Sequence, residues 1–291
     1  MMKKILFLLP FLIILVVPLS SLAPTQGQPE PSPISIILVG DMVFDRGVAY
    51  MIGKYGNNDF RFPFLKIADY LREADIVFGN LEGPISDKGT KVGSIYSFRM
   101  DSKTIGALNF ANVNVVSLAN NHAFDYGRIA FEDTIIRLKK AGIEAAGIGA
   151  PVIKEIDGTK IAFLAYTAFG PSQISKDDFG AITEEIKITK QDADILIVSL
   201  HAGEEYQKTP TQFQIDFNKM AEEAGADVVV HHHPHIVQQG IYSLGNFIFD
   251  QGFSEETMQS QIIEVKIQDK KISEIVTKNI KINEFFQPEI K

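Results

Sequence analysis

The sequence contains no cysteine among its 291 residues, which excludes a disulfide framework and any metal site built from thiolates. A metal ion would have to be bound by His, Asp, Glu or Asn side chains, which suit Mn, Fe, Zn or Mg better than a soft ion. A basic surface is also missing, because the formal net charge is −8 and no helical stretch carries repeated Lys or Arg. Nucleic acid is bound largely through positive charge, so we expect no nucleic-acid partner.

The N-terminal segment differs in kind from the rest of the chain. Two lysines precede an apolar run at residues 5–19, and the small residues Ser21 and Ala23 follow it. This order is typical of a secretory signal. We therefore expect residues 1–23 to be a signal peptide or an N-terminal membrane anchor, residues 24–33 to be a Pro-rich linker, and residues 34–285 to form the folded domain. In both cases the domain is expected to be extracytoplasmic, secreted or anchored to the cell membrane.

Short apolar runs and helical patterns alternate along the domain. Runs of this kind are typical of strands that are buried on both faces. They lie at residues 34–40, 74–79, 112–119, 193–200 and 226–230. Apolar residues at helical spacing predict helices over 64–74, 129–142 and 210–225, and alternation predicts an antiparallel hairpin over 259–282. The pattern predicts one α/β domain with two mixed sheets between helices.

Polar side chains follow each of the five apolar runs. They are Asp41; Asn80 and Glu82; Asn120, Asn121 and His122; His201; and the histidines of "HHHPH" at 231–235. All six histidines of the chain belong to this set. Because ligand sites of α/β sheets lie beyond the carboxyl ends of the strands, we expect these side chains to converge on one metal site. Glu204 and Glu205 begin a polar stretch and are expected to be solvated, unless one of them reaches the site.

The histidine-rich segment has a spacing of its own. On an extended backbone, His233 and His235 face the same side, and Pro234 stiffens the residue between them. Two imidazoles on one face make a suitable metal-binding pair. On the same assumption His232 points the other way, where it would contact substrate or a second ion only if the backbone turned.

Several stretches resemble the capsule-synthesis protein family, the poly-γ-glutamate capsule proteins related to CapA and PgsA. That family belongs to the calcineurin-like metallophosphoesterase superfamily. The stretches run in order from "VGDMVFDRG" (39–47) and "ADIVFGNLEGPIS" (74–86) through "NVVSLANNHAFDYG" (114–127) and "SLHAGEEY" (199–206) to "GADVVVHHHPHIVQ" (225–238) and "YSLGNFIFDQ" (242–251). The resemblance implies a layered α/β/β/α sandwich with two mixed sheets, a C-terminal hairpin and one or two divalent metal ions.

The resemblance also implies a role for each matching residue. The implied metal ligands are Asp41, Asn80, Glu82, Asn121, His201, His233 and His235. Asn80 and Glu82 stand where the superfamily has its bridging aspartate. His122 matches the catalytic histidine that protonates the leaving oxygen. Apart from the resemblance, Arg46 and Arg99 are candidate substrate-binding residues because guanidinium suits phosphate and carboxylate, and a surface salt bridge is the alternative for both. His232 is a third candidate for contact with the substrate.

The chain departs from the superfamily and family patterns at several positions. The usual Asp-x-His is Asp41-Met42-Val43, which removes one histidine ligand. Asn80 replaces a carboxylate, and His231 stands where the family more often has Gly. These changes predict a site that binds one metal well or two metals weakly. Because protons compete with metal for imidazole nitrogen, affinity is expected to fall as the pH drops through about 6 to 5.

Three functions are compatible with these patterns. The first is metal-dependent hydrolysis of a phosphoester in poly-γ-glutamate or capsular polymer biosynthesis or export. The second is a non-catalytic accessory protein that binds metal and an anionic polymer beside membrane-bound capsule synthesis partners. The third is an extracellular binding domain whose histidines are structural. Turnover of a phosphodiester separates the first from the second, and metal content separates both from the third.

Overall fold

The computed structural model describes residues 32–291, and Pro33–Lys291 form one compact unit. The expected signal peptide or anchor, and the expected linker up to residue 31, lie outside the described residues. Within residues 32–291, no helix is both long enough and apolar enough to cross a membrane.

Two sheets form the centre of the unit. The larger has the strand order β14-β13-β12-β1-β2-β3-β4, with β11 also paired to β1. Its strands are β1 (Ile34–Met42), β2 (Ile76–Leu81), β3 (Val113–Ser117), β4 (Glu144–Ala146), β11 (Asn246–Ile248), β12 (Gln259–Gln268), β13 (Lys271–Ile282) and β14 (Pro288–Ile290). The smaller sheet has the order β5 (Val152–Ile156), β6 (Thr159–Thr167), β7 (Ile195–His201) and β8 (Val228–His232). A separate pair joins β9 (Val237–Gln238) to β10 (Ser243–Leu244).

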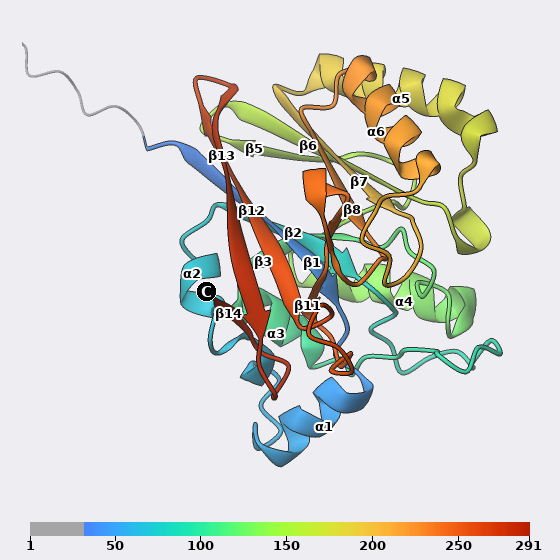
Figure 1. The fold of residues 1–291 in the computed structure, drawn as a ribbon, viewed down its shortest axis with the longest axis vertical. Helices are drawn as coiled ribbons and strands as arrows, with labels where there is room; N and C mark the ends of the chain where they lie inside the picture. The colour runs from blue at the N-terminus through green and yellow to red at the C-terminus, as the bar shows by residue number, and fades with distance from the viewer. Residues whose placement is uncertain (1–31) are drawn as a thin grey trace, which may run out of the picture. The chain divides into compact units, whose positions relative to one another are not determined.

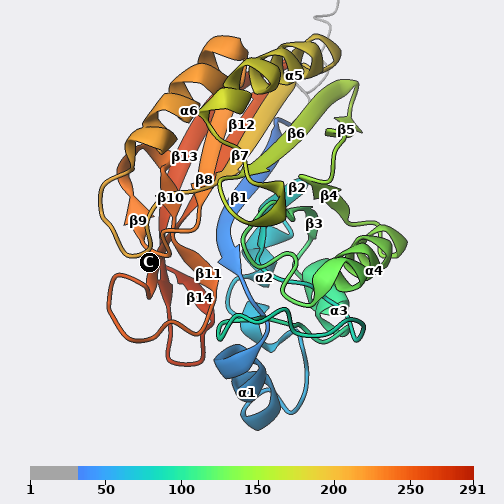
Figure 2. The ribbon, with the colours of Figure 1, turned by 90° about the vertical axis from the view of Figure 1, so that its right-hand side faces the viewer.

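Helices cover the outer face of each sheet (Figures 1 and 2). The larger sheet carries α1 (Arg46–Lys54), α2 (Ala68–Leu71), α3 (Thr104–Phe110) and α4 (Gly127–Lys140), and the smaller carries α5 (Phe179–Asp192) and α6 (Gln212–Ala224). Short 3-10 turns lie at η1 (Phe62–Phe64), η2 (Gly170–Ser172), η3 (Lys176–Asp178) and η4 (Gln239–Ile241). The order of layers is therefore α/β/β/α, and the predicted fold is confirmed.

The inner faces of the two sheets pack against each other. Phe78 of β2 and Phe163 of β6 stack across this interface with ring centroids 5.5 Å apart and planes at 13°. Residues on the other face of the same strands pack against helices, so β1, β2 and β7 are buried on both sides. This double burial explains why these strands are apolar throughout instead of alternating.

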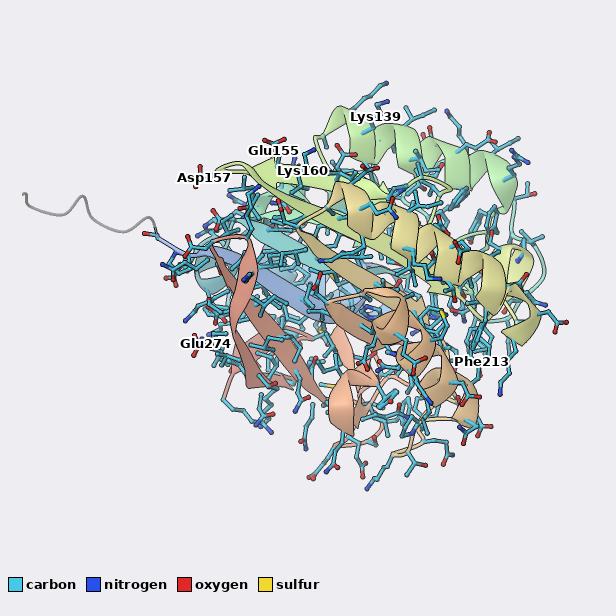
Figure 3. The ribbon with its side chains drawn as sticks, turned by 90° about the horizontal axis from the view of Figure 1, so that it is seen from above. Lys139, Glu155, Asp157, Lys160, Phe213 and Glu274 are labelled. Atoms are coloured by element: carbon cyan, nitrogen blue, oxygen red, sulfur yellow. The ribbon has the colours of Figure 1, made fainter. Side chains whose placement is uncertain are left out.

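The C-terminal hairpin is present as predicted. β12 and β13 pair antiparallel around Asp269 and Lys270, whose φ angles of 51° and 64° are those of a two-residue hairpin turn. β14 then pairs with β13, but only through residues 280–282 of β13. The fold thus continues past residue 285, where the sequence placed its end. Glu274 of β13 points away from the body, and Glu155, Asp157 and Lys160 lie together at the β5–β6 turn (Figure 3).

The helix predicted over residues 64–74 is wrong in extent. The structure has the 3-10 turn at Phe62–Phe64 and a single α-helical turn at Ala68–Leu71. Pro63 occupies the start of the 3-10 turn, and the buried side chains of Phe64, Ile67 and Leu71 fit two short turns as well as one helix. Several elements were not predicted, among them β6 and α5.

A buried carboxylate holds the loop after β2 against α4. Asp133 accepts hydrogen bonds from Ser86 Oγ at 2.7 Å and Arg137 Nε at 2.6 Å, and it pairs with Lys88 Nζ at 2.7 Å. Burial raises the pKa of Asp133, but these three donors outweigh burial and lower that pKa to about 2. The loop they fix begins just after Glu82, so this clamp supports the predicted site.

We predict that Asp133→Ala lowers the free energy of unfolding by about 2–3 kcal/mol, because the carboxylate makes several charge-assisted contacts. Asp87→Ala is the matched control, since the exposed Asp87 pairs with Arg137 alone within residues 32–291, and it should cost under about 1 kcal/mol. The folded pKa of Asp133 lies below the ordinary 3.8, so its contribution is complete above that value and lost as the pH falls toward 2. Urea unfolding at pH 7 and pH 3 measures the effect of each substitution and its pH dependence. Equal losses of unfolding free energy in the two variants would mean that Asp133 does not hold the loop against α4.

Candidate metal centre

Strand register aligns the predicted ligands in two rows. In the larger sheet, Asp41 of β1 lies opposite Asn80 of β2 and opposite Asn246 of β11. In the smaller sheet, His201 of β7 lies opposite His232 of β8. The strands of each row are parallel, so their carboxyl ends lie at the same edge, and the packing of the two sheets brings the rows together.

Two carboxylates are fully buried at this edge. Asp41 and Glu82 are both 0% exposed, and among residues 32–291 neither forms an ion pair with a lysine or arginine. Burial raises the pKa of Glu82 well above its usual value, and the charge of Asp41 adds to the effect. Burial also acts to raise the pKa of Asp41, but the imidazoles of His232 and His235 outweigh it and hold that pKa low. A pair of buried carboxylates without a paired lysine or arginine is a candidate site for a metal cation.

Two groups of side chains are compact enough to hold an ion. Asp41, Glu82 and His201 each offer a ligand atom, and these atoms lie within 4.8 Å of one another. Glu205, His233 and His235 form the second such group.

Buried atoms without hydrogen-bond partners mark the same place. They are Glu82 Oε1, His233 Nδ1 and both ring nitrogens of His232. Such atoms are costly to bury unless something binds them. Carboxylate oxygens and imidazole nitrogens are the donor set of Mn, Fe and Zn, so the residues fit a divalent metal ion.

Asn80 takes a different role from the ligand role that the resemblance implies. Asn120 Nδ2 donates to the Leu81 carbonyl at 2.9 Å and Asn120 Oδ1 accepts from His122 N, which fixes the Asn120 amide. Asn120 Nδ2 also donates to Asn80 Oδ1 at 3.0 Å, so the oxygen of Asn80 is engaged. Asn80 therefore turns its NH₂ group toward the site, where it donates to Asp41 Oδ1 at 2.8 Å and Glu82 Oε2 at 3.2 Å.

His201 and Asn121 lie together, as the sequence predicts. His201 Nε2 is 2.8 Å from Asn121 Oδ1, and His201 Nδ1 is 3.3 Å from the NH₂ group of Asn80. Burial, together with the neighbouring His233, lowers the pKa of His201 well below its usual value. His201 is thus a neutral imidazole and is available to a metal.

Asn246 is a functional residue that the sequence analysis missed. Its Nδ2 donates to the Thr257 carbonyl at 3.1 Å, so its Oδ1 faces His235 Nδ1 at 3.0 Å and accepts a hydrogen bond from it. That bond places a proton on His235 Nδ1 and turns Nε2 toward Glu82 Oε1, 3.8 Å away. A neighbour that fixes the tautomer in this way is typical of metal-bound histidines. The signal was the polar Asn after "YSLG", which has no neighbouring histidine in the sequence.

The extended backbone predicted for His233-Pro234-His235 is wrong. β8 ends at His232, and the φ angles of His233 and His235 are 99° and 58°. The chain turns here because the amide N–H of His233 donates to Asp41 Oδ2 at 3.2 Å, which pulls the backbone into the site. Both histidines still face the site, with ring centroids 5.9 Å apart.

His231 and His232 face opposite sides of β8. His232 lies inside, with Nδ1 3.3 Å from Asp41 Oδ1, and is 1% exposed. Its burial places it away from a substrate, and it belongs to neither group of candidate ligands. His231 points to α6, where its Nε2 is 3.3 Å from Asn218 Oδ1. This alternation follows from the strand itself.

The predicted catalytic histidine lies at the mouth of the site. His122 Nδ1 is 2.7 Å from Asp125 Oδ2, which also accepts from Phe98 N at 2.7 Å. The Phe98 ring packs on the imidazole with centroids 4.1 Å apart. Asp125 therefore holds the ring with Nδ1 protonated and leaves Nε2 facing Glu82 Oε1, 3.8 Å away.

A cleft of about 630 Å³ opens onto these residues. Its lining includes Asn121, His122, His235 and Glu205, with the aromatic side chains of Tyr96, Phe98, Tyr206, Phe249 and Phe253. Arg46 lines the cleft, where it pairs with Asp250 and lies over Phe98. Arg99 does not line it, because its guanidinium lies over the Tyr126 ring at 4.3 Å. Asp45 also lies outside the site, where it caps α1 and accepts from Arg99 N.

The fold is similar to that of two solved structures. A crystal structure described as a novel phosphatase from Mycoplasma pneumoniae matches with a TM-score of 0.54 and 16% identity, covering 86% of this chain and 94% of that one. A hypothetical protein from Thermus thermophilus matches with a TM-score of 0.55 and 14% identity over 84% and 98% of the two chains. At these identities the likeness concerns the fold alone.

Sequence comparison defines the family. Residues 35–251 match the family described as bacterial capsule synthesis protein PGA_cap. The capsule biosynthesis protein CapA of Bacillus anthracis is 32% identical over 294 residues, covering 89% of this chain and 70% of that protein. The PGA biosynthesis protein CapA of Bacillus subtilis (strain 168) is 28% identical, covering 81% and 68%. The chain belongs to the bacterial capsule synthesis protein family, and the resemblance is confirmed.

We predict that Mn²⁺ affinity rises with pH through the neutral range, up to about pH 9. Burial lowers the pKa of His235, but the carboxylates of Glu82, Asp41 and Glu205 outweigh it and raise that pKa to about 9. An ion must then displace a proton from His235, so affinity should change by about tenfold per pH unit below that value. Calorimetry at pH 6.5, 7.5 and 8.5 measures the slope. Constant affinity across this range would contradict the raised pKa of His235. A loss of affinity only between pH 6 and pH 5 would instead match an unperturbed imidazole.

We also predict that Asn246→Ala weakens Mn²⁺ binding by roughly 10–100-fold, because His235 loses the acceptor that fixes its tautomer. Asn246→Asp should retain the affinity, since a carboxylate oxygen accepts the same Nδ1 hydrogen. Calorimetric titration measures both variants, with thermal melting of the metal-free proteins as a check on folding. Equal losses in the two variants would mean that Asn246 acts through packing alone.

Proposed function

We propose that this protein is a metal-dependent hydrolase of phosphoesters that acts in capsular polymer biosynthesis or export. The observation that carries the proposal is the buried pair Asp41 and Glu82 beside His201, with no lysine or arginine paired to either carboxylate in residues 32–291. This arrangement calls for a divalent ion next to the cleft that His122 and His235 line. Membership of a capsule synthesis family supports the biological setting.

The residues around the ion position suit hydrolysis. A divalent ion bound there would lower the pKa of a coordinated water and neutralise charge on a phosphoryl oxygen. Asp41, Glu82 and His201 would hold it, with His233 and His235 in the adjacent group. His122 stands at the cleft with Nε2 free of the Asp125 bond. In the doubly protonated imidazole, Nδ1–H donates to Asp125 and the proton on Nε2 can pass to the leaving oxygen, which leaves a neutral ring. Asp125 acts through His122 and is a positioning residue.

The cleft wall bears on the choice of substrate. Arg46 is the one lysine or arginine among the described lining residues, and Asp250 already pairs with it. A long polyanion would meet little positive charge here beyond the ion itself. A small phosphoester, whose negative charge is concentrated at the ion, therefore suits the cleft better than an anionic polymer.

A non-catalytic accessory role is the second candidate. Val43 replaces a histidine ligand and Asn80 presents a donor group, so the ligand set is smaller than that of the superfamily. A relative from Mycobacterium tuberculosis (strain ATCC 25618 / H37Rv) is described as a probable polyglutamine synthesis accessory protein and is 23% identical, covering 71% of this chain and 70% of that protein. In this role the protein would bind metal and an anionic polymer without turnover.

The proposed setting follows from the N-terminal sequence. Residues 1–23 read as a signal peptide or membrane anchor, which would place the domain outside the cytoplasm beside membrane-bound capsule synthesis partners. The capsule-related names of the relatives are compatible with this setting.

We predict that the Mn²⁺-loaded protein hydrolyses bis(p-nitrophenyl) phosphate and that His122→Ala lowers kcat by roughly 10²–10⁴-fold, since general acid catalysis contributes about that much. Asp125→Asn should also lower kcat, because it loses the anion that orients the imidazole. His231→Ala is the control: its ring lies on the other face of β8, so turnover should persist in the folded variant.

Mn²⁺ content and thermal melting of each variant separate loss of chemistry from loss of metal or fold. Wild-type protein that binds Mn²⁺ but does not turn over any phosphoester would favour the accessory role. Wild-type protein that binds no divalent ion would overturn both candidates.

A further inference from the structure

One side of the centre lacks a ligand that the superfamily pattern would supply. Val43 stands at that position, is fully buried, and packs with Phe98 and Phe249 in an apolar cluster. Phe249 in turn lies against His235, with ring centroids 4.8 Å apart. The ligand set near His233 and His235 is therefore open on the side of the cleft.

Glu205 stands at this opening, and its position is fixed by the backbone. The amide of the next residue, Tyr206, donates to the Pro234 carbonyl at 2.9 Å, and the φ angle of Tyr206 is 63°. This bond ties the loop after β7 to the turn that carries His233 and His235. Gln251 Nε2 donates to Tyr206 Oη at 3.1 Å and supports the same loop from the other wall of the cleft.

A buried glutamine anchors the far end of the loop. Gln238 is 1% exposed, and its Nε2 donates to the carbonyls of Gln207 and Thr209 at 2.6 and 3.1 Å. On the other side of Glu205, the amide of Ala202 donates to the His232 carbonyl at 3.1 Å, so the loop is held both before and after Glu205. Because this loop is already ordered, placing Glu205 beside His233 and His235 costs less conformational entropy than it would on a free chain.

The two candidate ligand groups differ in depth. Asp41, Glu82 and His201 are all buried, whereas Glu205 is exposed above the buried His233 and His235. The groups are adjacent, because Glu82 Oε1 lies 3.8 Å from His235 Nε2. The unpartnered Nδ1 of His233, buried and belonging to the second group, is an independent sign of a missing ligand.

We infer that Glu205 is a metal ligand that, with His233 and His235, forms an outer ion position at the floor of the cleft, next to the inner position at Asp41, Glu82 and His201. Glu205 thereby takes the place of the histidine absent at Val43. The inference rests on the proposed metal-dependent function and assigns it a second, shallower ion. Because Glu205 is on the solvent side, the outer ion exchanges faster and faces the substrate.

The test compares Glu205→Gln with Glu204→Gln. Both changes remove one negative charge and keep the side-chain size, and Glu204 is the exposed neighbour that belongs to neither ligand group. Full-length wild type and both variants are titrated with Mn²⁺ by calorimetry, and bound Mn²⁺ is counted after dialysis. We expect two ions in the wild type and in Glu204→Gln. In Glu205→Gln the weaker ion should bind at least roughly 10–100-fold less tightly, since even a group that only supports a ligand is worth that much, while the tighter ion is unchanged.

The other outcomes overturn the inference in distinguishable ways. Equal binding by all three proteins removes Glu205 from the ligand set and leaves the proposed function intact. Equal weakening in both variants shows that only general negative charge on the loop matters, which also overturns the assignment. Weaker binding of the tighter ion in Glu205→Gln would place Glu205 at the inner position. It would overturn the assignment of Glu205 to an outer ion position. No Mn²⁺ bound by the wild type overturns the inference together with the proposed function.

Discussion

Burial of two carboxylates side by side is the constraint on which the rest of this site depends. Asp41 and Glu82 lie out of water, and within residues 32–291 no lysine or arginine pairs with either of them. An isolated buried charge costs several kcal/mol even after the protein relaxes. The surrounding groups reduce this cost in two ways. Asn80 donates hydrogen bonds to both carboxylates, and His235 is positively charged when no ion is bound. The remaining cost is what a divalent cation bound at this candidate site would remove.

The imidazoles divide by protonation state because their surroundings differ. His201 and His233 lie where burial dominates, which keeps them neutral: burial, with the neighbouring imidazoles, lowers the pKa of His201 far below its usual value and that of His233 to about 3. His235 faces three carboxylates and holds an extra proton instead. An arriving ion thus finds two ready ligands and one that must first release a proton. One cluster of like residues therefore combines preorganisation with pH sensitivity.

The sequence predicted where the site would be, because strand burial and strand ends are local properties. Asp41, His201 and the histidine segment converge since each ends a parallel strand, and this follows from apolar runs alone. The roles of single groups did not follow from the sequence. The orientation of Asn80 depends on Asn120, which depends on backbone groups of Leu81 and His122. The turn at His233 depends on a long-range bond to Asp41, and Asn246 reaches His235 through the pairing of β11 with β1. β6 was missed although it is one of the two central strands of the smaller sheet.

The long strand β13 has a consequence outside the site. In the described part of the chain, β14 pairs with its outer edge only near residues 280–282, so the backbone of the preceding residues presents free donors and acceptors along one side. An open edge of this kind invites a strand from another molecule to add to the sheet. Lys271, Glu274 and Lys278 are charged side chains spaced along this stretch, and docking a second strand would strip water from them. These charged side chains thus oppose edge-to-edge aggregation through β13, the longest strand of the described fold.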